Sequence, residues 1–154
     1  MIPLDKSMLL QQMIAFLTAV HETQHELSKD IPMGDITPLQ YGILEYIAVQ
    51  QPVTLSQISD CKHLSMPNAS RELRKLTDSG LCEKYADAAD KRKQAIRLTA
   101  EGQSFMNGAF GQMEVKFRHR IQHLSDEQLH QVYDAIELLQ ATLFRASSED
   151  GVKA

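Results

Sequence analysis

The sequence predicts a mainly α-helical protein with one small β-hairpin (an α+β fold), and three observations lead to this prediction. Apolar residues recur every three or four positions through most of the 154 residues, which is the period of an amphipathic helix. Proline, glycine and Ser/Thr caps divide this pattern into successive segments. Between the fourth and fifth segments, two short runs alternate apolar and polar residues on either side of a charged turn, as the strands of a hairpin do.

The first helix is expected over residues 4–27, where Leu10, Ile14 and Leu17 lie on one apolar stripe. The prolines and the glycine that follow end this helix. Thr37 then provides an N-cap, with a proline directly after it, for a second helix that continues to about residue 49.

Two further caps define the next pair of helices. Thr54 begins a short third helix, and Ser65 caps a fourth helix that has Pro67 in its first turn and ends at Gly80. The fourth helix has one apolar stripe and a polar opposite face. The apolar stripe consists of Ala69, Leu73 and Leu76.

Residues 81–86 and 94–98 are expected to form the two strands. A fifth helix begins at Thr99. Ser125 caps a sixth helix, which has Glu127 and Gln128 in its first turn. Both helices carry long apolar stripes. Residues 147–154 are expected to be a frayed tail.

Composition excludes several classes of protein. Hydrophobic residues make up 43% and charged residues 23% of the chain, as in a globular domain. The N-terminal apolar segment is interrupted by Gln11 and Gln12, so neither a signal peptide nor a membrane span is expected. Two cysteines without an export signal favour the cytoplasm. The chain has no Gly-rich phosphate loop, nucleophile elbow or HExxH helix, so we expect neither an enzyme nor a bound cofactor.

Positive charge is concentrated in the middle of an otherwise acidic chain. The formal net charge is −4, but residues 62–97 contain nine Lys and Arg against five Asp and Glu. Such a segment is either a solvated face or a surface for a polyanion.

The third and fourth helices have the order of a helix-turn-helix, in which the second helix presents its N-terminal and outward side chains to the DNA major groove. Asn and Arg can read bases, whereas Ser and Lys more often hold phosphates. The charged turn between the strands has the right size for the minor groove, and this makes double-stranded DNA the expected partner. The expected DNA-binding residues are Ser65, Pro67, Asn68, Ser70, Arg71, Arg74, Lys75, Lys91, Arg92 and Lys93.

From LSQISDCKHLSMPNASRELRKLTDSGLCEK through DAADKRKQAIRLTAEG, the chain resembles the MarR (multiple antibiotic resistance regulator) family of winged helix-turn-helix repressors. The wing of that family has the pattern D-x-x-D-x-R, followed after several residues by L-T-x-x-G. The resemblance implies that Arg92 enters the minor groove, that Asp90 holds it in position and that Asp87 supports the wing. The residues that match the wing pattern are Asp87, Asp90, Arg92, Leu98, Thr99 and Gly102.

The resemblance also implies a homodimer in which residues 1–34 and 100–146 form dimerisation helices around a winged module at residues 35–99. Within this module the recognition helix is expected at about 66–79 and the wing at about 81–98. Independently, the long apolar stripes of the outer helices call for burial against a large surface, although packing within one chain is the alternative. Such a dimer would be a ligand-released, sequence-specific transcriptional repressor on a near-palindromic operator.

Some residues depart from the family pattern. Lys62 and His63 stand where many relatives have Leu-Gly, so His63 is expected to need a positive φ. In the recognition helix, Glu72 and Arg74 replace an apolar residue and an acid that are common there. The operator of a relative therefore cannot be transferred to this chain.

The effector class stays open between three alternatives. By analogy with the family, a small aromatic or apolar molecule would bind between the first helix and the winged module. The residues expected to bind it are Met13, Leu17, His21, Tyr41 and Tyr46.

A thiol or a metal could instead provide the signal. Cys61 and Cys82 lie within the winged module, where the role of a small buried hydrophobe is favoured over an oxidant sensor. Two histidine pairs have the i, i+4 spacing that can hold zinc, with surface or interface histidines as the simpler interpretation, so no metal site is assigned. The pairs are His21 with His25 and His119 with His123. A winged module that binds proteins rather than DNA is a further alternative.

Overall fold

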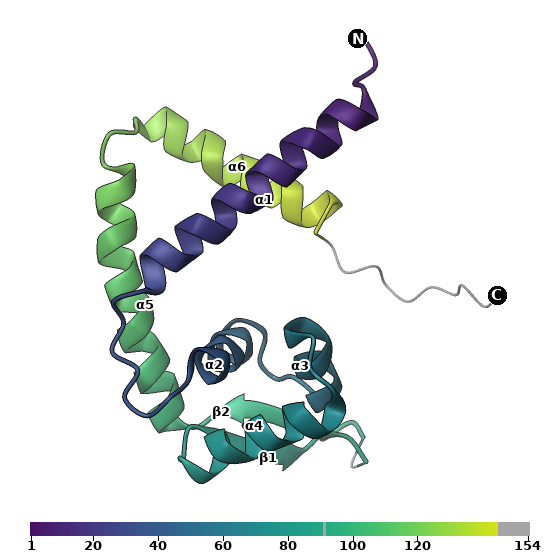
Figure 1. Cartoon of the computed structure of the whole chain (residues 1–154), viewed down its shortest axis with the longest axis vertical. Coiled ribbons are helices and arrows are strands. Elements are labelled where there is room, and N and C mark those ends of the chain that lie inside the picture. Colours follow the sequence, from purple (N-terminus) through teal and green to yellow (C-terminus); the bar gives the residue numbers. More distant parts are fainter. Residues whose placement is uncertain (91, 145–154) are drawn as a thin grey trace, which may run out of the picture. The chain divides into compact units, whose positions relative to one another are not determined.

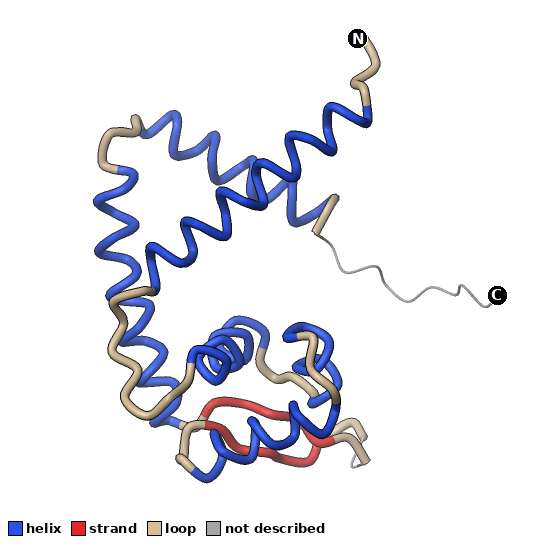
Figure 2. Tube along the Cα trace, in the orientation of Figure 1, coloured by secondary structure: helices blue, strands red, loops and turns tan. Residues whose placement is uncertain are grey.

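A computed structural model describes residues 1–90 and 92–144 of the protein. Within this part of the chain there are six helices and one antiparallel hairpin, so the expected mainly α-helical fold with a small wing is confirmed (Figures 1 and 2). Lys91 and the tail expected at 147–154 lie outside the described residues. The elements are α1 (Lys6–Ser28), α2 (Pro38–Gln50), α3 (Leu55–Lys62), α4 (Met66–Asp78), β1 (Cys82–Ala86), β2 (Gln94–Leu98), α5 (Ala100–Ile121) and α6 (Asp126–Thr142).

The chain divides into two compact units, Met1–Lys116 and Phe117–Ala154, and α2, α3, α4 and the hairpin all lie in the first. In that unit, α2, α3 and α4 pack with the hairpin around one hydrophobic core. Burial of each large aliphatic side chain there contributes about 1.5–3 kcal/mol. The large side chains that are completely buried include Ile43, Leu44, Ile47, Ile58, Leu73, Leu76, Ile96 and Met106.

Side-chain caps set where the helices begin. The hydroxyls of Thr37, Thr54 and Ser125 each accept a hydrogen bond from the backbone N–H three residues later, and the glutamine at that position bonds back to the cap. Ser65 caps α4 by accepting from the N–H of Asn68. Each cap expected from the sequence is therefore present.

A third segment of the chain pairs with the outer edge of the hairpin. β1 and β2 pair from Cys82 with Leu98 to Ala86 with Gln94. On the other edge of β2, the backbone of Val53 exchanges two hydrogen bonds with that of Ile96, at 3.0 and 2.7 Å. This bridge anchors the base of the wing to the segment between α2 and α3.

A close approach joins the wing to α5. The Thr99 hydroxyl donates to the carbonyl of Gly80 at 2.6 Å and accepts from the N–H of Gly102 at 3.0 Å, while the Thr99 N–H donates to the Leu81 carbonyl. A Cβ atom on Gly102 would overlap the carbonyl oxygen of Leu81. The T-x-x-G sequence thus lets α5 begin directly against the first residues of the wing.

Two expectations about α3 have different outcomes. His63 follows this helix with φ 53°, the left-handed conformation that the missing glycine predicted. The burial expected for Cys61 is wrong, because α3 turns Ile58 and Ser59 inward and leaves Cys61 exposed. Cys82, at the start of β1, is buried as expected.

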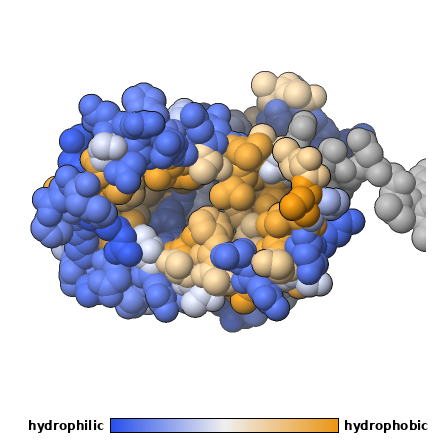
Figure 3. Space-filling view, turned by 90° about the horizontal axis from the view of Figure 1, so that it is seen from above, coloured by the Kyte–Doolittle hydropathy of each residue, from blue (hydrophilic) through white to orange (hydrophobic). Residues whose placement is uncertain are grey.

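Two of the outer helices, α1 and α6, bury none of their residues within the described chain. Each exposes several large apolar side chains, and a view of the molecule from above shows broad apolar areas (Figure 3). No helix among the described residues is both long and apolar enough to cross a membrane. The exposed apolar residues include Leu10, Ile14, Leu17 and Val20 on α1, and Val132, Tyr133, Ile136 and Leu138 on α6.

Candidate nucleic-acid interface

The recognition helix α4 has a sharp division between its buried and outward faces. The stripe of Ala69, Leu73 and Leu76 is buried, as expected. Because a helix turns by 100° per residue, this stripe directs Arg71 and Arg74 away from the core. Of the expected DNA-binding residues on or beside this helix, Ser70 is half-buried, and those exposed are Ser65, Pro67, Asn68, Arg71, Arg74 and Lys75.

Two aspartates fold the tip of the wing. The Asp87 carboxylate accepts from the N–H of Ala89, and the Asp90 carboxylate accepts from the N–H of Arg92, both at 3.0 Å. The backbone closes the turn through bonds from Asp87 N–H to the Lys93 carbonyl and from Lys93 N–H to the Asp90 carbonyl. Asp90 thus contacts Arg92 through the backbone N–H, so it fixes the turn from which the exposed arginine projects.

The strands of the wing contain a cation that is engaged within the sheet. Arg97 forms an ion pair with Glu83 at 2.7 Å, and its guanidinium lies 4.1 Å from the ring centre of Tyr85. Arg92 and Lys93, nearer the tip, instead line a hollow of about 520 Å³ together with the start of α3. The wing tip and the start of α3 therefore border one hollow, and Arg92 and Lys93 bring positive charge to it. The α3 residues and neighbours in this hollow are Thr54, Leu55 and Ser56.

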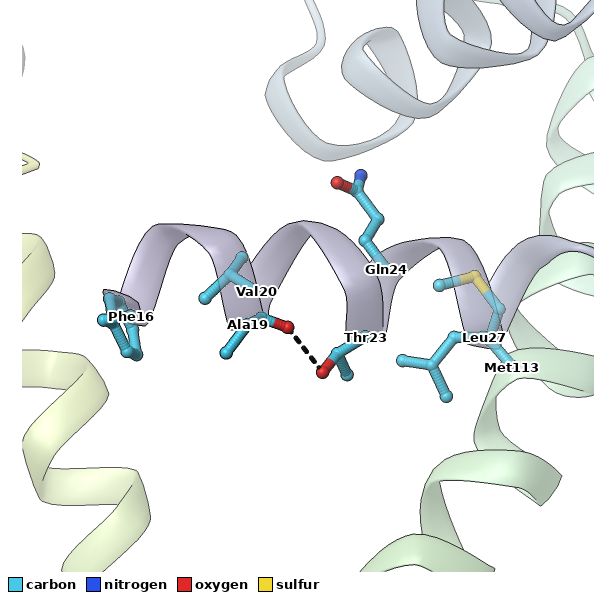
Figure 4. Close-up of a pocket in the computed structure, with 7 residues that line it drawn as sticks. All are labelled: Phe16, Ala19, Val20, Thr23, Gln24, Leu27 and Met113. Atoms are coloured by element: carbon cyan, nitrogen blue, oxygen red, sulfur yellow. Dashed lines mark hydrogen bonds between the residues drawn. The ribbon is translucent and has the colours of Figure 1, made fainter. Parts of the chain in front are cut away.

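The structure does not bring the five expected effector residues together. An apolar pocket of about 500 Å³ runs along α1 and reaches α5, but it is lined by other residues (Figure 4). His21 and Tyr41 line a separate, more polar hollow of about 220 Å³, whereas Met13, Leu17 and Tyr46 line neither. The residues of the apolar pocket are Phe16, Ala19, Val20, Thr23, Gln24, Leu27 and Met113.

Polar contacts hold α1 beside this pocket. The Gln24 amide donates to the Glu45 carboxylate of α2 at 3.2 Å, and Lys116 of α5 lies 2.6 Å from the Asp30 carboxylate just after α1. Tyr41 donates to the sulfur of Met113 at 3.7 Å, and burial together with Glu45 raises the pKa of Tyr41 to about 12. The Tyr41 hydroxyl is therefore a neutral donor.

The alternative sensors have little support in the geometry. Among the described residues, no three His, Cys, Asp or Glu side chains gather in a way that could hold a metal ion. Burial raises the pKa of the Cys82 thiol to about 12, so this cysteine is protonated and a poor nucleophile at neutral pH.

Comparison with known proteins finds similarity to transcriptional regulators. The sequence pattern of the MarR family matches residues 34–93. The HTH-type transcriptional regulator YfiV of Bacillus subtilis is 23% identical over 115 residues, which are 75% of this chain and 72% of that protein. The transcriptional regulator HosA of Escherichia coli is 29% identical over 86 residues, which are 56% of this chain and 59% of HosA. The matched segment thus spans less than two thirds of HosA.

Solved structures share the fold. A MarR family protein from Bacillus stearothermophilus superposes with a TM-score of 0.74 at 13% identity. The superposition covers 93% of this chain and 100% of that protein. MepR of Staphylococcus aureus bound to ethidium bromide gives 0.60 at 24% identity, covering 85% and 95% of the two chains. A MepR F27L mutant bound to an oligodeoxyribonucleotide gives 0.54 at 23% identity, covering 92% and 99%.

Proposed function

We propose that the chain is a cytoplasmic repressor of the MarR family, whose sequence pattern its winged helix-turn-helix module matches. It would bind a near-palindromic operator as a homodimer and be released by a small ligand. The observation that carries this proposal is that the basic residues of α4 and of the wing tip are exposed, while Arg92 and Lys93 border a hollow at the start of α3, the first helix of the helix-turn-helix.

The proposed docking places α4 in the major groove and the wing in the minor groove. Arg71 and Arg74 face the bases or phosphates, and Arg92 enters the narrow groove, whose negative potential attracts a guanidinium. The turn fixed by Asp87 and Asp90 lowers the entropy that Arg92 loses on binding, because its backbone is already ordered.

A second copy of the chain is the proposed cover for the apolar faces of α1 and α6. Neither helix buries a residue against the described part of the chain, and exposure of so many large apolar side chains is unfavourable in water. A twofold dimer would present two recognition helices to half-sites about one helical turn apart.

The proposed effector is a small aromatic or apolar molecule in the pocket between α1 and α5. Its walls are mainly apolar, and Phe16 and Met113 offer an aromatic and a polarisable contact at opposite ends (Figure 4). The MepR complex with ethidium bromide supports an effector of this class. A ligand that fits only one arrangement of α1 and α5 would shift the dimer towards a state with lower DNA affinity.

Fluorescence anisotropy with the DNA upstream of the protein's own gene tests the proposal. Binding should weaken as salt rises, with a slope of about −0.9 per phosphate contacted in a plot of log affinity against log salt. Binding that is absent or independent of salt would refute a DNA-binding role for this surface.

Arg92→Ala provides the residue-level test. It should weaken DNA binding about tenfold, in the range of a lost groove contact, without changing the dimer. The matched control is Arg97→Gln, which also removes a wing cation but one that Glu83 and Tyr85 already engage. If the two variants lose affinity equally, the wing acts only through its total charge and Arg92 has no specific place in the minor groove.

A further inference from the structure

An acidic residue lies on the border of the recognition face. Glu72 lies beside the buried stripe of α4, directly before Leu73, and its side chain is only 17% exposed. A carboxylate beside a DNA-binding face repels phosphates, so we looked for neighbouring groups that stabilise its charge.

Gln40 of α2 is such a group. Its amide nitrogen donates to a carboxylate oxygen of Glu72 at 3.0 Å, and the Gln40 side chain is itself buried, at 7% exposure. The other end of the same amide accepts from the N–H of Thr37 at 3.1 Å, as part of the capping box of α2. Because the cap orients the amide oxygen, the amide nitrogen has one direction left, which is towards Glu72.

The second oxygen of the Glu72 carboxylate lies 3.4 Å from the ammonium of Lys75, one turn further along α4. An exposed ion pair of this kind is normally weak, because both side chains must be ordered to form it. Here Gln40 already orders the carboxylate, so only Lys75 has to be restrained. Hydrogen bonding from Gln40, followed by Lys75, also lowers the pKa of Glu72, which keeps the carboxylate ionised at neutral pH.

We propose that Glu72 is a specificity-determining residue of the DNA interface, which, held by Gln40, restrains Lys75 at the edge of α4 and limits its binding to phosphates of any sequence. The proposal rests on the proposed function, because it concerns how DNA is chosen. Non-specific binding is mainly electrostatic and has no fixed register, so a released Lys75 could reach a phosphate in many registers. Base contacts fix a single register on the operator, so a released Lys75 would gain less affinity there.

The test compares a duplex selected from a random pool by the wild-type protein with a random duplex of equal length. Glu72→Gln keeps the size of the side chain and removes its charge. It should raise affinity for the random duplex about threefold and steepen its salt slope by about 0.9, as expected for one added phosphate contact. The ratio of selected to random affinity should fall by a similar factor.

Two variants separate this effect from a simple change of charge. Asp78→Asn removes an exposed carboxylate from the same helix, and it should leave the ratio unchanged. Adding Lys75→Gln to Glu72→Gln should cancel the gain on the random duplex, because the released cation is then absent. An equal loss of specificity in Asp78→Asn, or a gain that persists without Lys75, would overturn the inference.

A swap of the two side chains distinguishes this role from helix packing. Gln40→Glu keeps an acceptor for the cap but opposes two carboxylates, so it should lower the melting temperature. Adding Glu72→Gln restores an amide–carboxylate pair and should recover stability, but not specificity, because Lys75 still lacks its carboxylate. Full recovery of specificity would mean that Glu72 only packs the helix.

The selection itself separates the two levels of inference. If the wild-type protein enriches no sequence from the pool, the proposed function fails, and this role of Glu72 fails with it. If the wild type enriches a sequence and Glu72→Gln keeps the wild-type ratio, the inference about Glu72 alone is refuted.

Discussion

The winged module and the outer helices α1 and α6 differ in how their apolar faces are covered. Both contain regular apolar stripes, yet the module encloses its stripes between α2, α3, α4 and the hairpin, whereas α1 and α6 bury none of their residues in the described chain. The difference shows that an amphipathic pattern predicts a helix and its apolar face, but not which molecule covers that face. The module completes its own core, while the outer helices call for a further surface.

The largest expected effect comes from breaking that further surface. Replacing Ile14 and Leu17 of α1, which are 57% and 47% exposed, by aspartate should raise the dimer dissociation constant on the order of a thousandfold, because charges would be buried in an apolar interface. Sedimentation velocity measures this change. Gln12→Asp, on the other side of α1, is the control. A dimer that persists in the double variant would place the contact elsewhere.

A pair of glycines in α5 sharpens the comparison within one helix. Gly102→Ala should lower the free energy of unfolding by about 1–3 kcal/mol, because its Cβ would overlap the Leu81 carbonyl. Gly108→Ala meets no atom within 4 Å and should raise it by up to about 1 kcal/mol, the usual gain in helix propensity. Denaturant unfolding gives both values. The same sign for both would mean that α5 does not abut the wing as described.

The smallest expected effect compares the two cysteines of the winged module. Burial raises the pKa of Cys82 from its usual 9.0 to about 12, so the unfolded thiol ionises first and stability falls as pH rises above about 9. Cys82→Ala should remove about 1 kcal/mol of this loss of stability near pH 10. The loss that comes from Tyr41, whose pKa is also raised, should remain. Cys61→Ala, which removes a thiol from an exposed site, is the control. Equal profiles for all three proteins would contradict the buried thiol.

The sequence was sufficient to predict the helix starts and turns that depend on neighbouring residues alone. Thr37 and Ser65 predict helix starts because a cap acts within one turn, and His63 had to adopt positive φ because α3 and α4 are joined by so few residues. The contact from Gln40 to Glu72 spans 32 positions, and the pairing of Val53 with Ile96 depends on packing of separate elements. No periodic pattern reports such contacts.

The proposed effector pocket was harder to predict for a related reason. Apolar residues of α1 occur on more than one face, so the sequence allowed Met13 and Leu17 as well as Phe16 and Val20. Only the placement of Met113 on α5 selects the face that lines the pocket. The outward residues of α4, which are the proposed DNA contacts, were easier to choose, because a single buried stripe on α4 leaves one outward face.

The joint at Thr99 and Gly102 has a consequence for how this scaffold can be altered. Since α5 starts against the first residues of the wing without an intervening linker, an insertion at that end would displace the whole helix. The turn that starts at Asp87 is held by its own side-chain and backbone hydrogen bonds, and Ala88, Ala89 and Asp90 are exposed. Added residues there would lengthen the wing and leave its base intact. Engineering of a longer reach into DNA should therefore begin at the tip.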